Sequence, residues 1–373
     1  MSRFAAPAAR FACALAFHVA FAGIASADQS GFWLYDRSAT APLERGQFYA
    51  AFTFNAGVQH YPRFDGSVTL SDAGFRSFGA TGFSQNPLGI QPGGEIGFVL
   101  RDGTLPAFLG SRVRVGLFGS IVHAEQSFSS QRSPSTATFN AVDGRFLASL
   151  VMAPQTSLVE TLKVEREGFQ IGLKAESDVA LTSNLSISPL VAVFGGRTRE
   201  SFFYTAAVAN FIPGVADLDP AAINERLRTT EFGGHLGARI TWQFQPGLAL
   251  HAGGTAGPVW LQSNMSATDC FFPGPVRTGT GCTTSAVTRI TSVTDSRATI
   301  GFRGTATLGL VADLRIATVS LAGFGRYDSR IPGIQNPQQG ATVALAGLPA
   351  ARIRFKDGFA YGGAVSIRVA LGN

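Results

Sequence analysis

EFGGHLGARITWQF, the stretch from Glu231 to Phe244, alternates apolar and polar side chains along its length. A period of two residues is typical of a β-strand, because successive side chains of a strand point to opposite faces. Strands of soluble sandwiches usually run about five or six residues, and this stretch is more than twice that long. Its length and its two faces favour a strand that crosses a membrane, with apolar side chains toward lipid and polar ones toward the interior of a barrel.

Nine further segments share this alternation, and turns that contain Gly, Asp, Asn or Pro separate them. The connections alternate in length, with four short turns on the side of both chain ends and five long loops on the other, as in bacterial membrane barrels. We therefore predict an all-β fold, a transmembrane antiparallel up-and-down β-barrel of about ten strands with long extracellular loops. The expected strands are Gln47–Gln59, Gly94–Arg101, Ser111–His123, Glu167–Leu181, Leu185–Arg197, Glu231–Phe244, Leu248–Gln262, Ser296–Val311, Arg315–Tyr327 and Phe359–Leu371.

Twelve strands are the main alternative. Ala341 to Ala346 and Ala350 to Phe355 have the composition of one more hairpin, but each is shorter than the roughly 9 to 11 residues that a membrane strand needs. We leave both in the fifth long loop. Phe146 to Ala153 is ambiguous for the same reason, and Pro189 interrupts the alternation of the fifth strand.

One helix is expected, in the third long loop. Asp219 is a favoured N-cap residue, and Pro220 is favoured in the first helical turn. Ala221 to Arg228 contains good helix formers. These residues predict a short helix that either folds into the barrel or stands on its surface.

The N-terminal residues have the pattern of an export signal. Arg3 and Arg10 precede an apolar stretch from Phe11 to Ile24, which ends in the small residues Ala25-Ser26-Ala27. The remaining chain has no run of about 18 apolar residues, so any membrane crossing must be made by strands. The expected segments are a cleaved signal peptide, residues 1–27, a periplasmic segment, residues 28–46, and the barrel, residues 47–373.

Composition and charge limit the class of protein. Only 14% of the residues are charged and 44 are glycine, which makes the chain too apolar to be disordered. The formal net charge of +6 falls to +4 when the two arginines of the signal are removed, and this mild excess does not argue for nucleic acid. Nearly all positive charges are Arg. Genome composition is one explanation, and the other is that guanidinium groups suit interior ion pairs and the phosphates of surface lipopolysaccharide.

Two cysteines follow the signal peptide, Cys270 and Cys282, both in one segment. In an oxidising compartment such a pair forms a disulfide, which would close a short surface loop. The segment has no His or further Cys at ligand spacing, so we expect no metal site. Glycine pairs lie inside the expected strands rather than at strand-to-helix turns, and we expect no cofactor or nucleotide.

The polar faces of the expected strands supply the candidate functional residues. Positive charges outnumber negative ones on these faces. If the interior is open and wet, an Arg-rich lining favours anions and small polar solutes; if it is packed, the same side chains form a structural network of ion pairs. The expected lumen-lining residues are Glu95, Arg101, Arg112, Arg114, Lys174, Glu176, Glu231, His235, Arg239, His251, Arg303, Arg326 and Arg368.

Catalysis leaves no convincing pattern. The histidines beyond the signal are His60, His123, His235 and His251, and a hydrolase would need one of them beside a Ser or a carboxylate. His235 is expected to face His251 across two neighbouring strands, with Glu231 on the same face, but an interior histidine pair is more often structural. We therefore predict no catalytic residues and no enzyme.

The C-terminal residues resemble the final strand that the barrel-assembly machinery of Gram-negative outer membranes recognises. The residues that carry this resemblance are Gly362, Val365, Ile367, Val369 and Leu371. Family members usually finish on Phe, whereas this chain finishes on Leu371-Gly372-Asn373. From Gln47 to Asn373 the chain resembles small porin-like outer-membrane barrels. The resemblance implies an outer-membrane location after export, with the assembly machinery, outer-membrane lipid and lipopolysaccharide as partners.

Two functions follow from these patterns. The first is a porin-like passive channel for small polar or anionic solutes, which the Gly, Thr and Arg residues of the inner faces favour. In that case changing Arg112, Arg114 and Arg239 to Glu should invert the ion preference. The second is a closed structural or surface-binding, adhesin-like barrel that acts through its extracellular loops, which the length of those loops favours.

Overall fold

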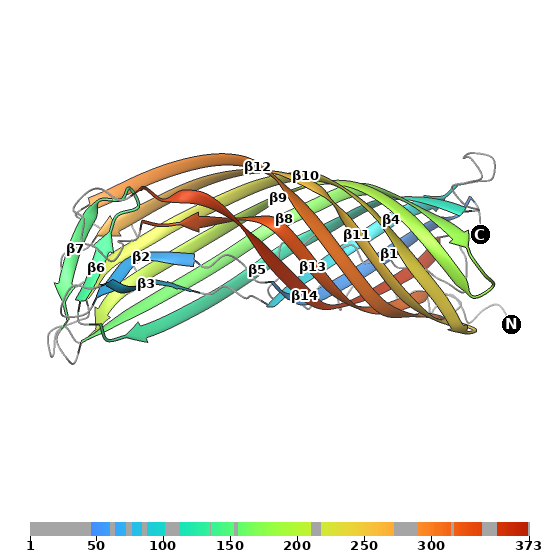
Figure 1. Cartoon of the computed structure of the whole chain (residues 1–373), viewed down its shortest axis with the longest axis horizontal. Helices are drawn as coiled ribbons and strands as arrows, with labels where there is room; N and C mark the ends of the chain where they lie inside the picture. Colours follow the sequence, from blue (N-terminus) through green and yellow to red (C-terminus); the bar gives the residue numbers. More distant parts are fainter. Residues whose placement is uncertain are drawn as a thin grey trace.

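The computed structural model describes residues 46–59, 64–71, 77–83, 88–100, 112–134, 136–152, 156–209, 218–271, 289–314, 317–337 and 349–371. In these residues, ten strands form one closed antiparallel barrel (Figure 1). They are β1 (Phe48–Gln59), β4 (Leu88–Val99), β5 (Arg112–Arg132), β8 (Ser157–Ala180), β9 (Leu185–Ala209), β10 (Leu218–Gln245), β11 (Leu248–Phe271), β12 (Arg289–Asp313), β13 (Thr318–Gln335) and β14 (Arg352–Leu371). Their ring order is β1-β14-β13-β12-β11-β10-β9-β8-β5-β4, so the predicted up-and-down barrel and its strand count are confirmed. The described part of the chain contains no helix long and apolar enough to cross a membrane.

The first and last strands close the ring. β1 pairs antiparallel with β14, from Phe48 opposite Leu371 to Gln59 opposite Ala360. We call the end where β1 begins and β14 finishes the terminal end, and the opposite end the loop end. In Figure 1 the terminal end is on the right. The expected signal peptide and almost all of the expected periplasmic segment lie outside the described residues.

An apolar belt surrounds the barrel. On β10 the side chains of Phe232, Leu236 and Ile240 are 61%, 68% and 49% exposed, whereas His235 and Arg239 between them are buried. The two faces expected for this stretch are therefore present. The ten residue steps from Phe232 to Trp242 rise about 33 Å along a strand, which corresponds to a height of about 25 Å at the usual tilt of barrel strands. That height matches the apolar band of an outer-membrane barrel.

The strands extend further toward the loop end than the sequence pattern predicts. β10 has 28 residues and begins at Leu218, whereas the expected strand began at Glu231. Between these positions the pattern is reversed: Ile223 and Leu227 are buried inside, and Arg226 and Arg228 are exposed outside. This part of the wall has water outside and an apolar core inside. The alternation expected for a membrane strand, with apolar side chains facing outward, therefore does not apply to it.

The helix predicted over Ala221 to Arg228 is wrong. These residues belong to β10, where Arg226 lies opposite Ser201 of β9 and Ser266 of β11. Pairing on both sides supplies each backbone group with a partner, and this tertiary pairing overrides a modest helix propensity. The Asp219-Pro220 pair stands at the start of the strand, where a missing N–H group costs least.

Four short strands form a second sheet at the loop end, which we call the plug sheet. They are β2 (Phe64–Ser71), β3 (Ser77–Phe83), β6 (Thr136–Asn140) and β7 (Phe146–Val151), in the order β3-β2-β6-β7. They come from the first two long loops. The ambiguous segment from Phe146 is therefore a plug strand and not a barrel strand, and Arg352 to Phe355 belong to β14. Ala341 to Ala346 lie outside the described residues.

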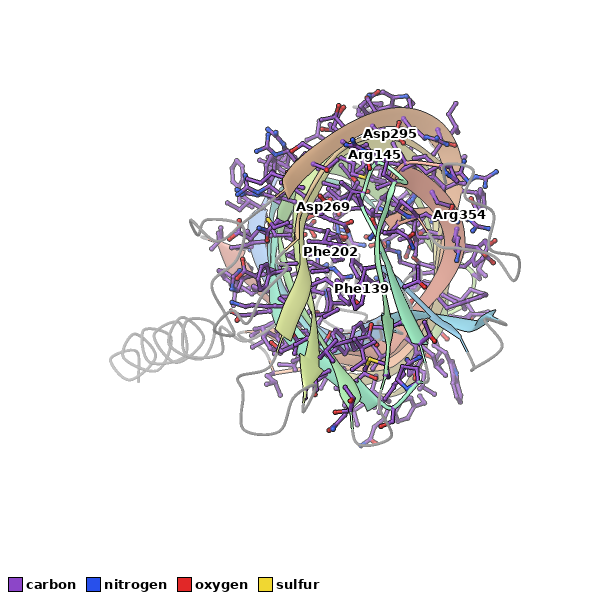
Figure 2. The ribbon with its side chains drawn as sticks, turned by 90° about the vertical axis from the view of Figure 1, so that its left-hand side faces the viewer. Phe139, Arg145, Phe202, Asp269, Asp295 and Arg354 are labelled. Carbon is purple, nitrogen blue, oxygen red and sulfur yellow. The ribbon has the colours of Figure 1, made fainter. Side chains whose placement is uncertain are left out.

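The plug sheet packs inside the mouth of the barrel (Figure 2). Phe64 stacks on Phe202 of β9 with ring centroids 5.5 Å apart, and Phe83 meets the edge of Tyr204 at 6.5 Å. Phe139 at the centre of the sheet is fully buried. The largest apolar core of the described residues therefore lies at the loop end, between plug and wall, and a smaller one, which includes Phe118 and Phe194, lies elsewhere in the barrel.

The wall is paired less completely between β12 and β13. Among the described residues these strands pair only from Arg303 opposite Asp328 to Asp313 opposite Thr318. β13 has a register shift between Asp328 and Ile331, where its pairing with β12 ends. Just above this point a backbone group contacts a side chain: Phe302 N donates to Ser329 Oγ at 2.7 Å.

Candidate functional site: the barrel interior

The structure buries most of the residues expected to line the interior. Arg114, Lys174, Glu176, His235, Arg239, His251, Arg303, Arg326 and Arg368 are buried, and Glu95 and Glu231 are intermediate. Arg101 lies outside the described residues, and the side chain of Arg112, at the start of β5, is not described. The buried residues form two ionic clusters, at different heights in the barrel.

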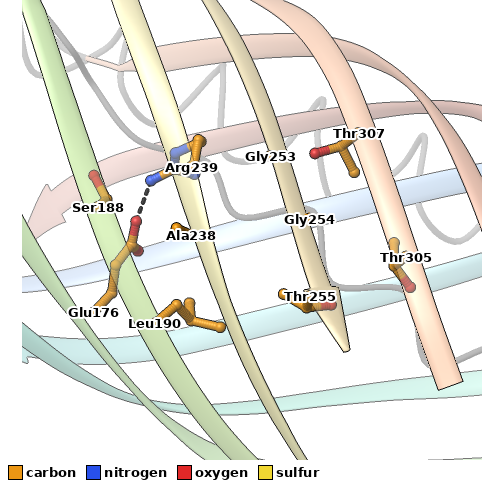
Figure 3. A pocket seen from close by; sticks show the side chains of 10 residues that line it. All are labelled: Glu176, Ser188, Leu190, Ala238, Arg239, Gly253, Gly254, Thr255, Thr305 and Thr307. Carbon is orange, nitrogen blue, oxygen red and sulfur yellow. Dashed lines mark hydrogen bonds and ion pairs between the residues drawn. The ribbon is translucent and has the colours of Figure 1, made fainter. Parts of the chain in front are cut away.

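The lower ionic cluster lies toward the terminal end and contains Glu95, Arg114, Lys174, Glu176, Asp178 and Arg239. Lys174 Nζ is 2.6 Å from Glu95 Oε2, and Arg114 Nη2 is 3.0 Å from Asp178 Oδ1 and 3.3 Å from Glu176 Oε1. Arg239 also donates to Glu176 Oε1 (Figure 3). Each carboxylate of the cluster thus has a cation within ion-pair distance.

Three further side chains join this cluster to the rest of the wall. Tyr49 Oη donates to Glu95 Oε1 at 2.5 Å, and Ser188 Oγ donates to Asp178 Oδ1 at 3.0 Å. The guanidinium carbon of Arg368 lies 5.2 Å from the centroid of the Tyr49 ring. The lower cluster therefore connects β14, β1, β4, β5, β8, β9 and β10.

Little free space remains beside Arg239. The cavity there has a volume of about 20 Å³ and is lined by Glu176, Ser188, Thr255 and neighbouring residues (Figure 3). A single water needs about 10 to 15 Å³. This cavity holds about one water molecule and is too small for a solute path.

The upper ionic cluster lies nearer the loop end and contains Gln170, Glu231, Arg303, Arg326 and Asp328. Arg303 Nη2 is 2.9 Å from Glu231 Oε2, and Arg303 Nε is 2.6 Å from Asp328 Oδ1. Arg326 also pairs with Asp328, and Gln170 Nε2 donates to Glu231 Oε1 at 2.9 Å. These residues come from β8, β10, β12 and β13.

The two interior histidines do not face each other, contrary to the prediction. His251 lies opposite Thr241 in the β10–β11 register, six positions from His235. His235 instead stands edge-on to the ring of Phe194, with centroids 4.9 Å apart. The Arg303 guanidinium carbon lies 5.6 Å from the same Phe194 ring. The tight turn between β10 and β11 fixes this register, and counting pairs from the turn places His251 opposite Thr241.

Sequence reasoning missed two carboxylates that balance the interior charge. Asp178 pairs with Arg114, and Asp328 pairs with both Arg303 and Arg326. Asp328 lies one residue beyond the expected end of its strand, Tyr327. Following the alternation from Lys174 and Glu176 to Asp178, and from Arg326 to Asp328, would have found both. The expected excess of positive charge is consequently almost removed.

Two backbone contacts fix the plug sheet to the wall. Val142 N, in the turn between β6 and β7, donates to Asp269 Oδ2 of β11 at 2.6 Å, and Asp269 Oδ1 accepts Thr291 N of β12 at 3.1 Å. Ala351 N donates to Val142 O at 2.6 Å. Burial raises the pKa of Asp269, although hydrogen bonds from Val142 and Thr291 offset part of that shift. Cys270 follows Asp269 and is buried; Cys282 lies outside the described residues, so the disulfide stays a prediction.

No protein-family model and no curated protein matches the sequence. Among solved structures, the outer membrane protease OmpT from Escherichia coli is similar with 10% identity and a TM-score of 0.43, over 89% of this chain and 99% of that chain. A FadL homologue from Pseudomonas aeruginosa has 11% identity and a TM-score of 0.22, over 87% and 90%. The transport unit of the autotransporter AIDA-I from Escherichia coli has 9% identity and a TM-score of 0.30, over 91% and 93%. These likenesses concern barrel architecture and not activity.

Proposed function

We propose that this chain is a closed outer-membrane β-barrel that acts at the cell surface through its loop end. One observation supports the proposal most: side chains fill the interior at three successive heights. Along β8, from the terminal end to the loop end, these are the lower cluster at Asp178 to Lys174, the upper cluster at Gln170, and the apolar core at Leu162 and Leu158.

Ion pairs that skip a strand occupy the path that a solute would need. Lys174 on β8 reaches Glu95 on β4, with β5 between them in the ring. Arg303 on β12 reaches Glu231 on β10, with β11 between them. Such pairs project from the wall into the interior, because each spans the strand that lies between its partners. Buried ion pairs of this kind are costly to break, because one charge is then left without a partner.

The porin-like function would require a wet interior with an excess of positive charge. The two clusters contain six basic side chains when Arg368 is counted, and five carboxylates balance them: Glu95, Glu176, Asp178, Glu231 and Asp328. The remaining excess is too small for a strong anion preference. The ion-preference inversion expected for a pore is therefore not part of this proposal.

The loop end offers a surface in place of a pore. Its wall projects beyond the apolar belt, as the stretch of β10 before Phe232 illustrates, and the plug sheet closes its mouth. A rigid projecting wall that carries long loops suits recognition of surface components. The proposal assigns the chain no catalytic activity.

The test is the conductance of the folded chain in a planar bilayer. We expect no stable unitary current at low voltage, because the lower and upper clusters leave no solute path. Folding is checked on the same sample by the shift in electrophoretic mobility between unheated and boiled protein. Stable current steps with anion preference from the folded sample would contradict the proposal and support the porin-like channel.

A further inference from the structure

Four arginines form a group on the outer wall of the loop end, which we call the arginine patch: Arg197 and Arg199 on β9, and Arg226 and Arg228 on β10. All four side chains are exposed. Arg199 lies directly opposite Arg228 in the β9–β10 register, and Arg197 and Arg226 are two residues away along their strands. The patch therefore places four guanidinium groups on two neighbouring strands.

These arginines make no ion pair with any residue that the structure describes. Other exposed basic residues near them do. Lys163 Nζ is 2.9 Å from both Glu125 and Glu165, which raise its pKa, and Arg297 Nε is 3.0 Å from Asp295. Glu167 on β8 lies opposite Arg199 in the register and is exposed, but one carboxylate beside four guanidinium groups leaves an excess of positive charge. This excess favours an anionic ligand from outside the chain.

A recess of about 650 Å³ lies at the patch and crosses β8 to β11. Arg199 and Arg226 line it, and Ser201, Asn224 and Ser266 add hydroxyl and amide groups. Glu165 also lies at the recess, but it is paired with Lys163. The recess combines fixed positive charge with neutral hydrogen-bond donors, which is the chemistry of a phosphate site.

The height of the patch identifies the source of the anion. Arg197 lies opposite Phe169, whose side chain is 54% exposed in the apolar belt. Arg228 lies four residues from Phe232, at the upper limit of the belt on β10. The patch is thus the first polar layer above the lipid tails, where the headgroups of the outer leaflet lie.

We propose that the arginine patch binds the phosphate groups of the phosphorylated glycolipid of the outer leaflet, lipopolysaccharide. The guanidinium groups of Arg199 on β9 and Arg226 on β10 bind one phosphate group. Arg197 and Arg228 contact the lipid on the side of the belt. This site lies on the outer wall and does not depend on whether the interior is closed.

The test compares the full folded chain with two double variants of equal charge change. R199Q/R226Q removes the arginines that line the recess, and R352Q/R354Q removes two exposed arginines of β14 on another part of the wall. Affinity for purified lipopolysaccharide, and for the same material after removal of its lipid A phosphates, is measured by titration in detergent. All four side chains are exposed, so both variants should fold, and the mobility shift on heating verifies this.

We expect R199Q/R226Q to bind intact lipopolysaccharide at least tenfold more weakly than the unchanged chain, and R352Q/R354Q to bind like the unchanged chain. Dephosphorylated material should bind the unchanged chain at least tenfold more weakly as well. An equal loss in both variants would show attraction by net charge alone, and binding that survives phosphate removal would show a different ligand. Either result would overturn the proposal.

Discussion

Glu225 carries its carboxyl group on the inner face of β10, at the contact between barrel wall and plug sheet. The side chain is 1% exposed, and its register neighbours, Phe202 on β9 and Ala267 on β11, belong to the apolar core. Burial raises the pKa of Glu225 from 4.5 to about 8, and a hydrogen bond with Asn336 offsets part of the shift. The folded chain therefore keeps a proton here that the unfolded chain loses near pH 4.5.

This difference makes stability depend on pH in a defined direction. The folded state binds the extra proton between pH 4.5 and about 8, so the contribution of Glu225 to stability falls as the pH rises through that window. Glu225→Gln replaces the neutral carboxyl by a neutral amide. We expect the variant to match the free energy of unfolding of the unchanged chain at pH 4 and to exceed it at pH 9 by on the order of 5 kcal/mol, since each pH unit between 4.5 and about 8 contributes about 1.4 kcal/mol.

The measurement is the free energy of unfolding in urea, in lipid vesicles, at both pH values. Asp269, whose pKa burial also raises, is present in both chains, so the difference between them isolates Glu225. An equal difference at pH 4 and pH 9 would mean that Glu225 is ionised in the folded state. Sequence reasoning did not single out this residue, because the third loop was expected to be helical there.

Among the elements, the plug sheet depends on few polar contacts with the wall. The charged hydrogen bond from Val142 N to Asp269 joins the turn between β6 and β7 to β11. Hydrogen bonds to charged groups contribute about 1.5 to 3 kcal/mol. Asp269→Ala should therefore speed amide hydrogen exchange in β6 and β7 by roughly 10- to 150-fold, while the paired strands of the belt stay protected.

A matched control removes a similar carboxylate that does not contact the plug. Asp295 Oδ2 on β12 accepts Ile353 N of β14 at 2.8 Å, a contact between two wall strands. Asp295→Ala should leave exchange in β6 and β7 unchanged. Equal exchange in all three chains would mean that the apolar core alone holds the plug.

Sequence analysis predicted the elements of the belt better than those of the loop end. For β10 and β11 the alternation identified both faces and the turn at Pro246-Gly247. The plug strands are short. Thr136–Asn140 alternates polar and apolar residues but has only five of them, fewer than the roughly 9 to 11 that a membrane strand needs.

The closed barrel that we propose has two barriers, the plug sheet and the ionic clusters, and each can be removed. Replacing residues 64–83 and 136–151 by short Gly-Ser linkers removes the plug sheet but leaves both ionic clusters. We expect this variant to stay silent in a planar bilayer. Changing both partners of Lys174–Glu95 and Arg303–Glu231 to Ala in the same background should open a conducting path, because charges are removed in equal numbers and the interior loses four charged side chains.

The mobility shift on heating confirms that each variant is folded before current is recorded. Steady current from the chain that lacks only the plug sheet would mean that the ionic clusters do not seal the barrel. Silence of the combined variant would place the barrier in side chains outside these clusters.

By itself, the sequence determined the barrel and its belt. The alternation of apolar and polar residues is a local pattern, and along each strand it indicates which face meets lipid and which face meets the interior. Only the tertiary structure decided that the interior is filled. Glu231 pairs with Arg303, 72 residues away in the sequence, and Glu176 pairs with Arg239, 63 residues away. Such long-range ion pairs depend on how the ring closes and how its strands tilt. The structure also decided where the pattern reverses, because at the loop end the inner face of the wall packs against the plug sheet and its outer face is polar.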